Sequence, residues 1–113
     1  MNNEDYQAKL DEILARCKYR EIAEEKLILT LAMAEAAGIK MTLVQQLTLT
    51  SHLCAMVERS QEGGEIPEVD PAMFSEVSEL ALNLSAQVCE LLPNLAVGEK
   101  YLLSIHFEAA RLN

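Results

Sequence analysis

Hydrophobic residues recur every three or four positions along most of the chain, which is the period of an amphipathic helix. The first such segment covers about residues 4–18, and the second covers about residues 22–37 and ends at Gly38, a residue type common just past a helix end. The polar residues 18–21 allow two interpretations. They either separate two helices or lie on the surface of one long helix.

Three more helices are expected in the rest of the chain. Thr42 is a suitable N-cap for a helix that runs to about Arg59, and its buried candidates are Val44, Leu47, Leu53, Met56 and Val57. The glycines and proline of residues 60–69 predict a loop. Asp70 and Pro71 then favour a helix over about residues 71–91, and the last helix is expected over about residues 97–111.

No segment alternates with a period of two, so the expected fold class is an all-α bundle of about five helices. At 113 residues the chain has the length of a single compact domain. Within it, residues 1–21 are expected to form an N-terminal amphipathic helical segment, and residues 22–113 the main helical domain.

The composition argues against nucleic-acid and membrane partners and against secretion. The formal net charge of −9 opposes contact with nucleic-acid phosphates and with anionic membrane surfaces. The polar, acidic amino terminus does not resemble a secretory signal, and no apolar stretch approaches the length of a membrane span. Three widely spaced cysteines suggest reduced thiols rather than a disulfide framework. We therefore expect a cytoplasmic protein without direct nucleic-acid or membrane contact.

The only two histidines each share a helix face with a charged residue seven positions away. His52 precedes Arg59, and Glu99 precedes His106, so at roughly 100° per residue each pair is turned only about 20° apart. Two interpretations stay open. Either these are ordinary packing histidines, or Arg59 reaches back toward an anion on His52 while Glu99 orients the ring of His106.

Other chemistry is less well supported by the sequence. A metal site built from His52, Cys54 and His106 is disfavoured, because positions 52 and 54 point about 200° apart on one helix. The chain has no glycine-rich phosphate loop and no nucleophile elbow. We expect no metal, no cofactor and no enzymatic activity.

Three segments resemble signatures of a known family. LTSHLCAMVER, residues 49–59, resembles the first signature of the phosphotransferase-system regulation domain (PRD), a histidine followed by a helix-closing arginine. Asp70-Pro71 resembles the family's Asn-Pro step. GEKYLLSIHFEAA, residues 98–110, resembles its second signature, a glutamate followed seven residues later by histidine. The resemblance covers about residues 22–111.

This resemblance implies a small bacterial regulatory protein, homodimeric, that contacts a phosphocarrier protein or a permease subunit of the phosphotransferase system. His106 and His52 would be the phosphoryl acceptors, with Arg59 and Glu99 as supporting residues. A stand-alone domain of this kind would signal through protein–protein contacts, in the regulation of transcription or carbohydrate uptake. Ser51 stands where the family commonly has an aspartate. The alternative is therefore an assembly partner that keeps the fold without being phosphorylated.

Overall fold

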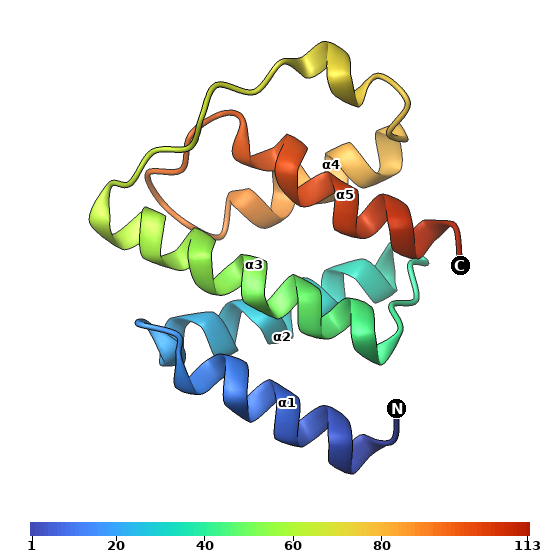
Figure 1. The fold of residues 1–113 in the computed structure, drawn as a ribbon. Coiled ribbons are helices and arrows are strands. Elements are labelled where there is room, and N and C mark those ends of the chain that lie inside the picture. The colour runs from blue at the N-terminus through green and yellow to red at the C-terminus, as the bar shows by residue number, and fades with distance from the viewer.

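The computed structural model describes residues 1–113 and is entirely helical, which confirms the expected all-α class (Figure 1). It contains five α-helices and one short 3-10 helix. In chain order these are α1 (Asn3–Ala15), α2 (Arg20–Ala36), α3 (Leu43–Glu62), η1 (Pro71–Phe74), α4 (Glu79–Cys89) and α5 (Glu99–Arg111). None of these helices combines the length and apolar character that crossing a membrane requires.

The polar residues between the first two predicted helices separate them. α1 ends at its C-cap Arg16, whose backbone N–H donates to the Ile13 carbonyl, and the backbone N–H of the next residue, Cys17, donates to the Leu14 carbonyl. The connection is fastened to the end of α3, because the Tyr19 hydroxyl donates to Glu62 at 2.8 Å and Lys18 forms an ion pair with the same carboxylate. α1 and α2 are therefore distinct helices.

α3 is the central helix of the bundle. It begins with the predicted cap, since Thr42 accepts a hydrogen bond from the Gln45 backbone while the Gln45 side chain accepts one from the Thr42 backbone. It packs against α1, α2 and α5. Val44 lies on its outer face and is 56% exposed, so its predicted burial was wrong. The largest fully buried hydrophobic side chains come from α3 and from the helices around it: Leu49, Leu53, Met56, Val57, Val88, Leu103 and Phe107.

The single helix predicted over residues 71–91 was wrong, because the structure divides that segment into η1 and α4. Ser78 caps α4 by accepting a hydrogen bond from the Ala81 backbone. Glu108 on α5 accepts further hydrogen bonds from the Ser78 hydroxyl, at 2.7 Å, and from the Ser78 backbone. A carboxylate thirty residues away thus holds Ser78 in the extended conformation in which a helix begins.

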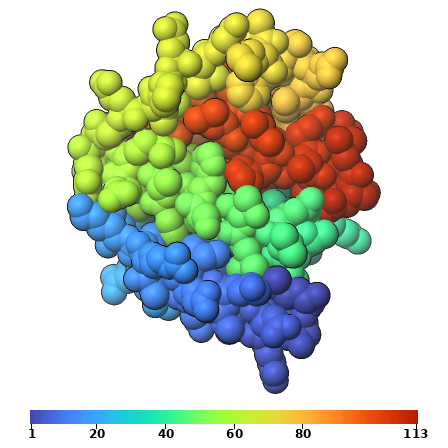
Figure 2. All heavy atoms as spheres, viewed as in Figure 1, coloured from blue at the N-terminus to red at the C-terminus, as the bar shows by residue number.

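The segment between α3 and η1 passes over the start of α5 (yellow-green and red in Figure 2). A Cβ atom added to Gly98 would lie only 2.9 Å from Val69 Cγ2, so any larger residue at this position would have to displace the Val69 side chain. On the other side, the Ser60 hydroxyl donates to the Pro93 carbonyl at 2.6 Å. These contacts hold the α3–η1 segment against the start of α5, and the α4–α5 connection against the end of α3.

Candidate functional site

The two histidines meet at the crossing of α3 and α5. His52 Nδ1 on α3 lies 3.2 Å from His106 Nε2 on α5, within hydrogen-bond distance. The rings stand edge to face, with centroids 4.9 Å apart and planes at 75°. Both side chains are partly buried between the two helices. Residues 54 positions apart in the sequence thus form one pair of rings.

Arg59 and Glu99 form a second pair at the same crossing. The Arg59 guanidinium donates from Nε to Glu99 Oε2 at 2.7 Å and from Nη2 to Oε1 at 2.8 Å. The Glu99 side chain is 1% exposed and that of Arg59 is 23% exposed. A bidentate, charge-assisted contact of this kind is the geometry in which a buried carboxylate is best satisfied.

The antiparallel direction of α3 and α5 explains both pairs. Seven residues forward from His52 along α3 lies Arg59, and seven residues back from His106 along α5 lies Glu99. The expected contact of Glu99 with His106 was therefore wrong, whereas the expectation that Arg59 meets an anion on His52 stays a prediction. Glu99 holds Arg59 rather than His106, and the ring of His106 is held by His52. The sequence contained a signal for this arrangement. In the first motif the histidine precedes the charged residue, and in the second it follows it, so antiparallel helices bring histidine to histidine and charge to charge.

Both rings are neutral near pH 7. Burial, with smaller contributions from the positive charges of His106 and Arg59, lowers the pKa of His52 to about 4. Burial also lowers the pKa of His106. A neutral imidazole keeps one nitrogen lone pair, which is the form that acts as a nucleophile or as a hydrogen-bond acceptor.

Burial also decides which ring donates. His52 Nε2 is sealed inside the protein and has no hydrogen-bond partner. A proton there would leave an unsatisfied buried N–H, at a cost of about 1–3 kcal/mol. The proton of His52 therefore sits on Nδ1 and is donated to His106 Nε2. His106 then carries its own proton on Nδ1, which has no protein partner and is not sealed from solvent.

A comparison with solved structures identifies the fold family. The sequence matches no protein-family model and no curated protein. It is, however, similar to the crystal structure of a PRD-containing transcription regulator from Lactobacillus casei ATCC 334. The TM-score is 0.88 at 39% sequence identity, over 92% of this chain and 93% of that one. The chain belongs to the PRD family.

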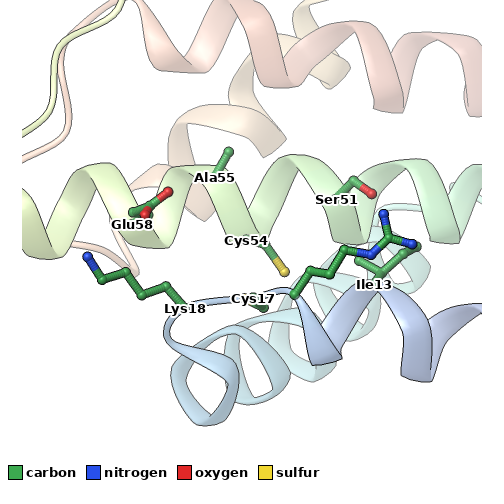
Figure 3. Close-up of a pocket in the computed structure, with 8 residues that line it drawn as sticks. Ile13, Cys17, Lys18, Ser51, Cys54, Ala55 and Glu58 are labelled. Atoms are coloured by element: carbon green, nitrogen blue, oxygen red, sulfur yellow. The ribbon is translucent and has the colours of Figure 1, made fainter.

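One position of this PRD departs from the common family pattern without disturbing the site. Ser51 is exposed and lines a pocket between α1 and α3, together with Cys17, Cys54 and Glu58 (Figure 3). It makes no hydrogen bond with His52. An aspartate at this position would thus lie toward α1, and the orientation of the His52 ring in this PRD comes from His106 instead.

The four residues predicted from the two motifs lie in two pairs between α3 and α5 of this PRD. Their burial distinguishes them from the exposed ion pairs elsewhere on the molecule, such as the one between Arg20 and Glu24. Exposed pairs contribute little to stability, about 0–1 kcal/mol each. A buried ion pair costs more desolvation free energy to form than an exposed one. A change of charge beside it therefore alters the stability of the fold more.

Proposed function

We propose that this PRD is a regulatory, non-enzymatic domain that receives a phosphoryl group on its histidine pair. The donor would be a phosphocarrier protein or a permease subunit of the bacterial phosphotransferase system. The output would be a change in protein–protein contacts, in the regulation of transcription or carbohydrate uptake. The observation that carries the proposal is the neutral His52–His106 pair set beside the buried Arg59–Glu99 pair.

The geometry gives phosphorylation a structural consequence. A phosphoryl group brings close to two negative charges and three acceptor oxygens. It does not fit between nitrogens 3.2 Å apart, so the rings must separate. Arg59 is the cation whose charge acts on His52, and a new phosphate would compete with Glu99 for it. Loss of Arg59 would leave a buried carboxylate unpaired, which weakens the contact between α3 and α5.

A second copy of the chain is the proposed partner for part of this response. Ile105 and Leu112 lie on the outer side of α5, seven residues apart, and are 52% and 68% exposed. They therefore present an apolar strip on the helix that carries His106. A homodimer contact there would be coupled directly to any movement of α5.

One observation favours the alternative, a non-phosphorylated assembly partner. His52 Nε2 is enclosed like the nitrogen of a packing residue. In that case both rings would serve only to hold α3 against α5. The two functions differ in whether the pair reacts with a phosphoryl donor.

The test is incubation with the purified phosphocarrier system and labelled phosphoenolpyruvate. Wild type should take up label, and a His52→Ala/His106→Ala double variant should not. Arg111→Ala is a matched control, because it removes an ion pair of α5 with Glu108 outside the site and should still be labelled. Light scattering before and after labelling would report a change in oligomeric state. An unlabelled wild type would contradict the proposal and favour the assembly partner.

A further inference from the structure

We infer that the two histidines have different tasks: Nε2 of His106 accepts the phosphoryl group, and His52 positions that nitrogen and afterwards holds the phosphate. The inference rests on the proposed function, since it assigns the atoms of the same site. It predicts one phosphoryl group per chain. The symmetry of the two sequence motifs would instead suggest two equivalent acceptors.

Of the four ring nitrogens, only His106 Nε2 has a lone pair that a phosphoryl donor can reach. Phosphoryl transfer needs a nitrogen lone pair, and each neutral ring has one. The lone pair of His52 is on Nε2, which is buried without any partner. Both Nδ1 atoms carry protons, that of His52 for the bond to its neighbour and that of His106 toward solvent. His106 Nε2 is the remaining lone pair, and it is freed when the His52 ring moves aside.

The transfer balances without an additional base. The lone pair of His106 Nε2 forms the bond to phosphorus, while the bond between phosphorus and the donor breaks and its electron pair leaves with the donor. The ring then holds the proton on Nδ1, which is not sealed from solvent, so this proton can be released to water. The N–H at Nδ1 of His52, which had donated to His106, is then directed at the phosphoryl oxygens. His52 is therefore a positioning residue.

The chemical test uses potassium phosphoramidate, a small phosphoryl donor that releases ammonia and requires no protein partner. Phosphorus NMR of the intact protein would distinguish a phosphoryl group on Nε2 from one on Nδ1. We expect one group per chain, on Nε2 of His106, and none in His106→Gln. Circular dichroism would check that each variant is folded.

Two variants at position 52 separate positioning from packing. His52→Asn places an amide N–H near the position of the imidazole Nδ1–H, whereas His52→Leu fills space without a donor. A hydrogen bond to a charged group is worth about 1.5–3 kcal/mol, so His52→Leu should lose its phosphoryl group about ten- to a hundredfold faster than wild type. His52→Asn should restore most of the lifetime.

Several results would overturn the inference: label on His52 of the wild type, label on Nδ1, two groups per chain, no reaction with phosphoramidate, or equal lifetimes in the Asn and Leu variants. The donor question stays separate. If phosphoramidate labels Nε2 of His106 but the phosphocarrier system does not label the protein, the proposed donor is wrong and the atom assignment is supported.

Discussion

Replacing Arg59 by methionine should destabilise the protein far more than replacing its partner Glu99 by leucine. The Arg59→Met variant leaves a carboxylate that is 1% exposed without its guanidinium. Breaking a buried pair in this way costs about 3–5 kcal/mol, a large part of the roughly 5–15 kcal/mol that stabilises a small domain. The Glu99→Leu variant leaves an arginine whose side chain is already 23% exposed and can turn its charge toward water, so we expect roughly half that loss.

The assay is urea denaturation followed by far-ultraviolet circular dichroism near pH 7 and near pH 5. The double variant Arg59→Met/Glu99→Leu should recover to within about 1–2 kcal/mol of wild type, because a buried ion pair can be replaced by apolar residues of similar volume. The deficit of Arg59→Met should shrink near pH 5, since a stranded carboxylate becomes neutral by taking up a proton. Equal losses in the two single variants, together with an additive double variant, would refute the asymmetric burial on which this reasoning rests.

Three further predictions concern pH and local packing. Burial lowers the pKa of His52 to about 4, whereas an unfolded histidine titrates near 6.5. The neutral, buried His52 therefore contributes fully to the free energy of unfolding above pH 6.5, and this contribution falls by about 3 kcal/mol as the pH drops to 4. The urea midpoint of His52→Asn should therefore change less than that of wild type across this window, and an equal change would contradict the prediction. Thr42→Ala should lower the thermal midpoint through a loss of about 1 kcal/mol of capping energy, while Thr42→Ser should retain it. Gly98→Ala should cost about 1–3 kcal/mol in urea denaturation by crowding Val69, and Val69→Ala in the same chain should relieve the loss. Failure of that rescue would show that the contact is not the cause.

The sequence was sufficient for those features that depend on neighbouring residues. The all-α class, the Thr42 cap and the end of α2 before Gly38 were predicted, because periodicity and capping act within a few positions. The break between η1 and α4 was missed, and the side chain that accepts hydrogen bonds from Ser78 at this break is Glu108, thirty residues further along the chain. Local patterns carry no information about a partner so distant.

The same limit applies to the candidate site. The motifs supplied all four of its residues, and helix geometry placed them correctly in two pairs that each share a face. Periodicity does not say which helix lies opposite that face, however, and partners were therefore assigned along one helix instead of across two. Glu99 in particular was matched with His106, although its carboxylate binds Arg59. Protonation could not be predicted either, because it depends on the burial of His52 Nε2.

Because α3 lies between α1 and α5, a change at the histidine pair can be followed through Cys54 on the other side of α3. Two residues after His52, Cys54 points to the opposite side of the same helix, into the pocket shared with Cys17 on the α1 side (Figure 3). Burial and the neighbouring thiol raise the pKa of Cys54 to about 12, so its reactive thiolate is scarce at rest. A rotation of α3 that opened the pair would also alter this pocket. The rate at which Cys54 reacts with a thiol reagent would then report on the histidine pair on the other side of α3, without an engineered cysteine.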